Sequence, residues 1–299
     1  MKRFAAFAAG LALIGMPLSV AAEIQLGDLF NSIKQAFKPA TQDEEIAIGR
    51  DAAATLLGAS KPVDDTAVQE YVNKVGLWIA LQSDRPDLPW HFAVVDSDDV
   101  DAFAAPGGFV FVTRGLLLHL HSEAELAGVL GHEISHVVLK HHLNALQKAA
   151  RMDLASQAAK VGLASKGYDS DMDQALMDKV SNATRNLYSK GLDKDDELAA
   201  DRMGVVLATR AGYDPYGLLA VLQTLQAADP KSSKMQLLMA THPSPADRIA
   251  ALSAAMGAGN MDHFGKQPEV QERFEGVMKD LVADAKKKEK EAPAAATKK

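Results

Sequence analysis

The stretch of sequence that decides the fold reads Gly131-His132-Glu133-Ile134-Ser135-His136-Val137-Val138. It lies within a run, Ser122 to Leu146, that is predicted to form a single amphipathic helix. His132 and His136 are four residues apart, so their imidazoles lie on one face of such a helix, about one turn apart. Two neutral ring nitrogens at this separation can bind one zinc ion.

The neighbours of this histidine pair favour a buried metal site. Glu133 follows the first histidine, where its carboxylate can reach a water at the metal rather than the metal itself. Apolar side chains cover much of the remaining circumference: Leu126, Val129, Leu130, Ile134, Val137 and Val138. The alternative interpretation is a solvated helix face with ordinary surface histidines. A helix this apolar is predicted to be buried, and its histidines and glutamate then need a partner such as a metal.

The composition favours a globular protein with one sizeable core. The chain has 299 residues, of which 47% are hydrophobic and 24% charged, with a net charge of −7. This acidic balance gives no support for nucleic-acid binding, so no nucleic-acid partner is predicted. The chain contains no cysteine, so we expect neither disulfides nor a lipoprotein. Any zinc must then be held by histidine and carboxylate side chains.

The N-terminus has the pattern of a secretory signal peptide. Two basic residues precede an apolar segment, Phe4 to Val20, which ends at the small-residue cleavage site Val20-Ala21-Ala22. An uncleaved membrane anchor is the alternative. We expect residues 1–22 to be a signal peptide and the mature protein to be periplasmic. No later apolar run is long enough to predict an internal transmembrane helix.

The remaining pattern predicts an α+β fold that is predominantly helical. Before the central helix, we expect helices over residues 42–57 and 64–81 and strands over residues 90–95 and 109–113. Ala102 and Phe103 lie in a further extended segment that is expected to form an edge strand. After the central helix, further helices are predicted to start at three residues with capping side chains: Asp193, Asp214 and Ser244. A small sheet beside a buried helix is typical of an α+β domain.

The same patterns suggest domain boundaries. We expect a leader over residues 23–40, a metallopeptidase domain over 41–265, a C-terminal helix over 266–285 and a disordered Lys/Ala-rich tail over 286–299. Residues 151–191 are predicted to be connecting helices. The alternative is a mobile segment that lies over the site.

Two sets of residues compete to supply a third zinc ligand. His142 nearly fits the pattern His-Glu-x-x-His-x-x-Gly-x-x-His, but Leu139 stands where that pattern needs glycine. The helix is therefore predicted to continue and to turn His142 off the metal face, as it does His141. We expect these two histidines to have helix-end or supporting roles.

The second set is the run Asp196-Glu197-Leu198-Ala199-Ala200-Asp201. Glu197 and Asp201 are one helical turn apart, as the two histidines are. Glu197 completes a His2Glu site with a fourth position open, the form of zinc coordination found in catalytic sites. Asp201 can accept the outer N–H of a liganding histidine and so fix its tautomer. The alternative is an acidic, solvated helix face.

Two further residues are candidates for the site. His242 precedes a predicted helix by two residues and can act as a fourth ligand in a resting state or as a donor to an oxyanion. A loop histidine with neither role is the alternative. Arg248, on the following helix, is a candidate for the same electrostatic role or for pairing with Asp201.

Four motifs occur in the order found in one family of zinc metallopeptidases. The chain resembles the HtpX, Oma-type and CAAX prenyl protease family (gluzincins) at Ala102-Phe103-Ala104-Ala105-Pro106-Gly107-Gly108, Gly131-His132-Glu133-Ile134-Ser135-His136, Glu197-Leu198-Ala199-Ala200-Asp201 and His242-Pro243. The resemblance spans roughly Thr41 to Ala255. It is greatest for the soluble periplasmic branch of BepA-like and LoiP-like members, although we expect neither a helical-repeat domain after the motifs, as in the former, nor a lipobox cysteine, as in the latter. Where the family usually has Asn-Ala-Phe, this chain has Asp101-Ala102-Phe103, so no side-chain role carries over to position 101.

The resemblance implies a zincin-like domain and a role for each matching residue. It implies one Zn²⁺ per chain, with His132, His136 and Glu197 as ligands. Glu133 would be the general base, and His242 would lie near the metal. A peptide would lie extended along the edge strand at Ala102 and Phe103 and bind through main-chain hydrogen bonds.

We therefore expect a zinc-dependent endopeptidase that cleaves unfolded or misassembled proteins in the bacterial cell envelope. Peripheral association with the membrane or with envelope assembly machinery is part of this expectation. One alternative is a zinc-containing periplasmic chaperone or assembly factor with little or no proteolysis. The other is a self-inhibited peptidase in which His242 or the 151–191 segment blocks the site.

Overall fold

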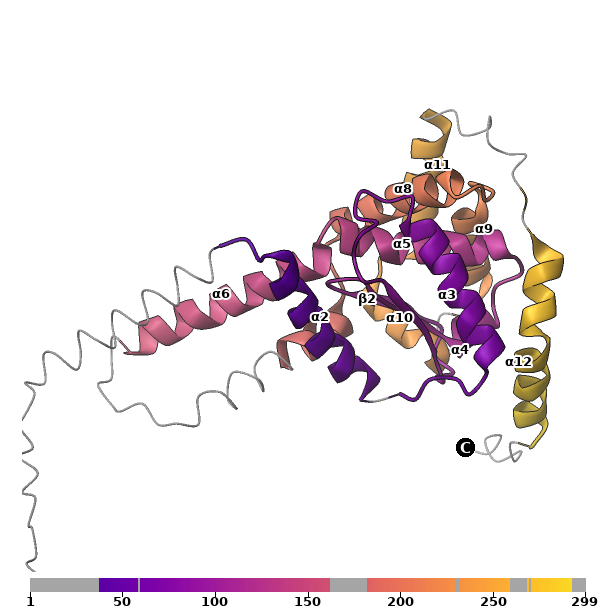
Figure 1. Cartoon of the computed structure of the whole chain (residues 1–299), viewed down its shortest axis with the longest axis horizontal. Coiled ribbons are helices and arrows are strands. Elements are labelled where there is room, and N and C mark those ends of the chain that lie inside the picture. Colours follow the sequence, from indigo (N-terminus) through magenta and orange to yellow (C-terminus); the bar gives the residue numbers. More distant parts are fainter. Residues whose placement is uncertain are drawn as a thin grey trace, which may run out of the picture. The chain divides into compact units, whose positions relative to one another are not determined.

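The computed structural model describes residues 38–58, 60–161, 182–229, 232–258, 268 and 270–291 (Figure 1). Contacts divide the chain into two units, and the larger one comprises Ala40–Ala150 and Gly167–Lys299. All residues of the site described below belong to this larger unit. The predicted signal peptide, most of the leader and residues 162–181 of the 151–191 segment lie outside the described residues.

The described elements form an α+β arrangement in which helices predominate, which confirms the predicted fold class. The α-helices are α2 (Gln42–Leu57), α3 (Thr66–Ala80), α4 (Arg114–Leu117), α5 (Glu123–Val138), α6 (His141–Val161), α8 (Lys194–Arg210), α9 (Gly217–Ala227), α10 (Gln236–Thr241), α11 (Pro245–Ala258) and α12 (Gln271–Glu291). Residues 182–190 are also helical, and a 3-10 turn, Ser233–Met235, precedes α10. The strands are β1 (His91–Val95), β2 (Ala102–Ala105) and β3 (Phe109–Thr113), in the order β1-β3-β2.

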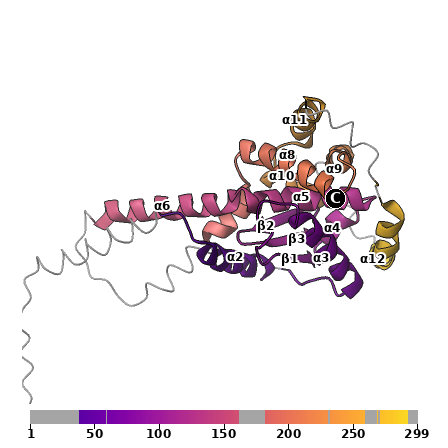
Figure 2. The same cartoon turned by 45° about the horizontal axis from the view of Figure 1, so that its top comes forward.

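Helix α5 lies at the centre of the larger unit. It packs against β2 and α3 on one side and against α8 and α9 on the other, as Figure 2 shows. Every residue from Glu123 to Val137 is buried, as expected for a helix that is apolar on nearly all sides. The hydroxyl of Ser122 accepts a hydrogen bond from the backbone N–H of Glu125, which confirms the predicted helix start. The Glu125 carboxylate accepts from the backbone N–H of His121.

The prediction of one continuous helix from Ser122 to Leu146 is wrong. Helix α5 ends at Val138, and Lys140 has a φ of 60°, the left-handed conformation that commonly terminates helices. The Lys140 side chain points to a buried acid, with its Nζ atom 3.5 Å from Oε2 of Glu45. A new helix, α6, starts at His141. The break matters because the two histidines that follow it lie on a separate helix.

Among the described residues, strand β2 forms one edge of the sheet, and no strand pairs with its outer side. It pairs antiparallel with β3, while β1 pairs parallel with the other side of β3. The Thr113 N–H donates to the carbonyl of Asp101 at 3.0 Å, which makes these two a hydrogen-bonded pair. Such pairs alternate along an antiparallel ladder. The backbone N–H and C=O groups of Ala102 and Ala104 therefore face away from β3, toward the free edge.

The C-terminal helix differs from its predicted bounds. Helix α12 runs from Gln271 to Glu291, so it starts later than residue 266 and continues into the predicted tail. Lys, Glu and Ala are good helix formers, which explains the extension of the helix into the charged segment. Its apolar side chains, which lie in the core, recur at helical spacing: Phe274, Met278 and Leu281. Within the described residues, none of the helices has the length and apolarity that a membrane span requires.

A buried ion pair fixes the tight turn between β2 and β3. Glu45, on α2, is fully buried and accepts hydrogen bonds from both terminal nitrogens of Arg85, at 2.7 and 2.9 Å. It also accepts from the backbone N–H of Gly107, at 3.2 Å. Gly107 has a φ of 77°, so this turn requires glycine. The pair thus positions the edge strand that lies beside the site.

Replacing Glu45 should destabilise the fold strongly. Glu45→Ala leaves Arg85 without its partner in a largely buried position, which we expect to lower the free energy of unfolding by about 3 kcal/mol. Urea denaturation followed by circular dichroism measures the change. The matched control is Glu70→Ala, which removes an exposed pair with Lys74 and should change stability by less than about 1 kcal/mol. Equal effects of the two substitutions would contradict this role of Glu45.

Candidate metal centre

Two glycines allow α5 and α8 to approach closely next to the histidine pair. A Cβ atom at Gly131 would lie 2.6 Å from the carbonyl oxygen of Gly204, and one at Gly204 would lie 2.7 Å from the backbone nitrogen of His132. Real side chains do not tolerate such contacts, so this approach requires residues without a Cβ. The two helices can therefore bring the histidine pair of α5 and the acidic pair of α8 into one site.

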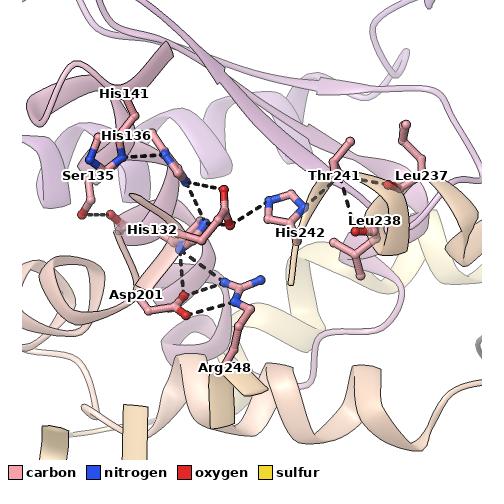
Figure 3. Close-up of polar contacts among 12 residues, drawn as sticks. His132, Ser135, His136, His141, Asp201, Leu237, Leu238, Thr241, His242 and Arg248 are labelled. Carbon is pink, nitrogen blue, oxygen red and sulfur yellow. Dashed lines mark hydrogen bonds and ion pairs between the residues drawn. The ribbon is translucent and has the colours of Figure 1, made fainter. Parts of the chain in front are cut away.

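The nitrogen and oxygen atoms of the predicted ligands converge. The Nε2 atoms of His132 and His136 are 3.0 Å apart. Glu197 faces both, with Oε1 3.5 Å from Nε2 of His136 and Oε2 3.7 Å from Nε2 of His132. The Nε2 atom of His242 lies 3.7 Å from Oε2 of Glu197. Figure 3 shows the three histidines in this arrangement. The structure thus brings together all four residues that the sequence placed at or near a metal.

These atoms fit a zinc ion. Zinc binds nitrogen and oxygen at about 2.0–2.2 Å in a tetrahedron, which puts neighbouring ligand atoms about 3.3–3.6 Å apart. The separations between these donor atoms lie close to that range. Ligand atoms of His132, Glu197 and His242 all lie within 4.8 Å of one another. The Oε2 atom of Glu197 is buried without a hydrogen-bond partner, so it has an acceptor site to offer to a cation.

Burial gives the histidines the protonation state that metal binding needs. It lowers the pKa of His132 and lowers those of His136 and His242 further, so all three imidazoles are neutral near pH 7. Neutral imidazole is the form that binds metal. Burial also raises the pKa of Glu197 to about 8. A cation held by the carboxylate would favour its ionised form.

The outer nitrogen of His132 has an anionic partner. Oδ1 of Asp201 lies 2.9 Å from Nδ1 of His132. Arg248 binds the same carboxylate through two nitrogens, at 3.0 and 2.6 Å (Figure 3). Burial opposes ionisation of Asp201, but Arg248 and His132 outweigh it and hold the pKa of this carboxyl far below its usual range. Asp201 therefore carries a permanent charge that orients the imidazole of His132.

The outer nitrogen of His136 contacts His141, for which only a general supporting role was predicted. Its Nδ1 atom lies 3.0 Å from Nδ1 of His141, whose Nε2 atom lies 3.6 Å from Oδ1 of Asp196. The contact exists because the chain breaks at Lys140 and starts α6 with His141 beside His136. His142 also returns to the site, and its ring centroid lies 5.2 Å from that of His136. Their supporting positions agree with the expectation, but the helix geometry behind it was wrong, because a new helix and not a continued α5 carries both histidines.

A cavity of about 30 Å³ lies between this cluster and the edge strand. It is lined by Ala102, Phe103, Glu133 and several neighbours, including Tyr188 from the helical segment 182–190. Glu133 is buried, and burial together with the nearby Glu197 raises its pKa well above the usual value. This places a buried carboxyl group in the cavity, together with His136 and Phe103.

Tyr188 was not predicted from its own sequence signal. Its hydroxyl donates a hydrogen bond of 2.5 Å to the carbonyl oxygen of Ala104, and its ring stacks on His142 with centroids 4.9 Å apart. It also makes an edge contact with Phe103. The sequence indicated a position near the site only through the alternative in which the 151–191 segment lies over it. A single tyrosine between unpatterned residues gives no stronger signal.

Replacing Asp201 should weaken metal binding. Asp201→Asn removes the charge that orients His132 and leaves Arg248 without an ionic partner, so we expect zinc affinity to fall about 10- to 100-fold. Competition with a chromophoric chelator measures the affinity. Asp247→Asn is the matched control because it removes an exposed carboxylate that pairs with Lys194. Equal zinc affinity in the two variants would show that Asp201 does not support the metal.

Comparisons with known proteins agree with this geometry. Residues 66–256 match the model of Peptidase family M48, which covers more than half of the chain. The chain is 27% identical over 239 residues to the β-barrel assembly-enhancing protease of Escherichia coli K12, and 30% identical over 247 residues to that of Yersinia pestis. These alignments cover 79% and 80% of this chain, but only 44% and 50% of the relatives.

A eukaryotic protein matches the chain to a comparable extent. The mitochondrial metalloendopeptidase OMA1 of Arabidopsis thaliana is 27% identical over 218 residues, which are 72% of this chain and 42% of that protein. The chain thus spans about half the length, or less, of the curated relatives it matches. The matched segment contains the histidine pair of α5, the acidic pair of α8 and His242. On these grounds, the chain belongs to peptidase family M48.

Proposed function

We propose that this protein is a zinc-dependent endopeptidase that cleaves unfolded or misassembled proteins in the bacterial cell envelope. The observation that carries the proposal is the position of Glu133, which lies buried between a His2Glu set of metal-binding atoms and a free strand edge. The names of the bacterial relatives, and the predicted signal peptide at residues 1–22, support the envelope assignment. Residues 41–265 form the peptidase domain in this proposal.

Each side chain at the site has a distinct part in peptide hydrolysis. Zinc held by His132, His136 and Glu197 would supply a Lewis acid and lower the pKa of water. Glu133 accepts a proton from the attacking water and then passes it to the leaving amine. The same carboxylate thus takes up and releases the proton. His242 lies on the cavity side of Glu197, where its ring can donate a hydrogen bond to the carbonyl oxygen as that oxygen gains charge.

The free edge of β2 supplies a binding surface for an extended peptide. The outward side of β2 offers the carbonyl of Ala102 and the N–H of Ala104, and displacement of Tyr188 would also free the carbonyl of Ala104. A peptide that adds to this edge binds by main-chain hydrogen bonds, and Glu133 lines the adjoining cavity. Such binding needs an unfolded segment, which supports unfolded or misassembled proteins as substrates.

A chaperone with a structural zinc is less well supported. A structural zinc site uses four protein ligands and has no need of a proton acceptor. The buried carboxyl of Glu133 is unfavourable for stability because burial penalises its charge. Its position beside the metal-binding atoms is explained by proton transfer. This is the reason for preferring a peptidase.

A self-inhibited resting form is a second candidate, and Tyr188 favours it. The cavity of about 30 Å³ has room for a few water molecules and is too small for a peptide. The Tyr188 hydroxyl occupies the outward carbonyl of Ala104, which a peptide strand would need. Segment 182–190 must therefore shift before substrate binds. We propose that this closed form limits activity until a substrate or partner displaces the segment.

Glu133→Gln should separate metal binding from turnover. The amide keeps the size of the side chain but cannot accept the proton, so we expect one zinc per chain and a fall in kcat of about 10²- to 10⁴-fold. Metal analysis and casein degradation by the purified protein measure the two quantities. Glu70→Gln, an exposed glutamate on α3, is the control and should match the parent. Full activity of Glu133→Gln would eliminate the mechanism.

Tyr188→Phe should make the site easier to enter. Phenylalanine keeps the ring that stacks on His142 but loses the hydroxyl that binds Ala104. Because one hydrogen bond contributes about 0.5–1.5 kcal/mol, the closed form should weaken and KM for a peptide should fall about 2- to 10-fold. Steady-state kinetics measure KM, with Ser189→Ala as the control, since that hydroxyl bonds within its own helix to Asn186. An unchanged or higher KM would refute the closing role of Tyr188.

A further inference from the structure

The buried side chain of Asp101 carries a carboxyl group at the cavity. The proposed mechanism of peptide hydrolysis does not use this group. Its residue is 4% exposed, and its Oδ1 atom is buried without any hydrogen-bond partner. Its backbone is fixed, because the N–H donates to Oγ1 of Thr113 and the carbonyl accepts from the N–H and hydroxyl of the same residue. The side chain lines the cavity together with Glu133 and Glu197. It is therefore a fixed acceptor at the place where a peptide would bind.

The charges around the cavity leave Asp101 uncompensated. Three acids line it: Asp101, Glu133 and Glu197. The nearby cation, Arg248, is bound by both oxygens of Asp201. In the part of the chain that the structure describes, no Lys, Arg or His forms an ion pair with Asp101. A divalent ion, as in the proposed function, would balance the charges of Glu133 and Glu197, so an ionised Asp101 would have no positive partner.

The electrostatics of Asp101 agree with a missing cation. Burial raises the pKa of this carboxyl to about 8, although a hydrogen bond from the backbone N–H of Ala102 opposes the rise. A carboxyl with such a pKa is mostly neutral at pH 7, so the closed form avoids most of the cost of a buried charge. A cation in the cavity would favour the ionised form and bind to it. The unpartnered Oδ1 atom is the acceptor for this bond.

We infer that Asp101 is a specificity-determining residue that binds a cationic group of the peptide, close to the scissile bond. The inference rests on the proposed peptidase function and names a preference within it. Asp101 directly precedes Ala102, whose outward carbonyl would pair with the peptide, while the N–H of Ala102 donates to the Asp101 carboxyl. A peptide on this edge thus brings a residue next to the Asp101 carboxyl and to Glu133. The cation is either a Lys or Arg side chain or a free α-amino group, since both offer the same N–H donors and charge.

A binding measurement tests Asp101 without depending on turnover. The probe is a fluorescein-labelled extended peptide with one Lys, compared with peptides in which norleucine, an uncharged residue of similar size, replaces Lys. The zinc-loaded Glu133→Gln full-length protein should bind the Lys peptide about tenfold more tightly, as expected for one charged hydrogen bond. Glu133→Gln/Asp101→Asn should bind both alike. Glu133→Gln/Asp87→Asn, which alters an exposed acid, is the control and should keep the tenfold ratio.

The outcomes separate this inference from the proposed function. Equal binding of Lys and norleucine peptides by Glu133→Gln would overturn the role of Asp101, and this comparison needs no second substitution in the protein. A tenfold ratio that survives Asp101→Asn would also overturn it, because an amide can replace only a neutral donor or acceptor. Acetylating the peptide's N-terminus, or its Lys side chain, shows which cation is bound. If the parent protein did not degrade casein, the proposed peptidase function would be refuted. The ratio of the affinities for the Lys and norleucine peptides would still test the role of Asp101.

Discussion

The close contact between the backbones of α5 and α8 is the constraint on which the rest of the structure depends. Gly131 and Gly204 are in contact at distances that exclude any Cβ atom. The metal-binding atoms of His132, His136 and Glu197 come from these two helices, and their separations suit one ion only at this helix spacing. Metal-ligand distances tolerate changes of about 0.2 Å. A shift of the helices by the size of a methyl group would therefore disperse the site while leaving both helices intact.

Some buried charged groups of the site have a partner of opposite charge and others have none, and this difference relates to function. Asp201 and Arg248 neutralise each other and stay charged, so they hold His132 in a fixed orientation. Within the described residues, no Lys or Arg forms an ion pair with Glu133, Glu197 or Asp101, and burial raises the pKa of each. An arrangement like this is costly for stability and is typical of sites that bind ions or transfer protons. The apolar shell of α5 and the Glu45–Arg85 pair supply the stability that the site does not.

The sequence predicted the parts that depend on local spacing and missed those that depend on tertiary contacts. Helical periodicity put His132 and His136 on one face, and Glu197 and Asp201 on another, and the structure joins those faces. The strand at Phe109–Thr113 and the helix at Gln42–Leu57 were predicted with their observed bounds. The break at Lys140 was missed because its side chain contacts Glu45, almost a hundred residues earlier, and no local residue signals it. The positions of His141 and Tyr188 depend on that break and on a distant helix, so no spacing rule could have found them.

The most direct test of the central claim is a zinc-edge anomalous difference map from a crystal of the zinc-loaded protein. The account predicts one strong peak per chain, at about 2.0–2.2 Å from Nε2 of His132, Nε2 of His136 and a carboxylate oxygen of Glu197. A distance of the same size to His242 would identify it as a fourth ligand in the closed form. A peak at His141 or His142 instead, or no peak between α5 and α8, would contradict the assignment of the metal centre and the function built on it.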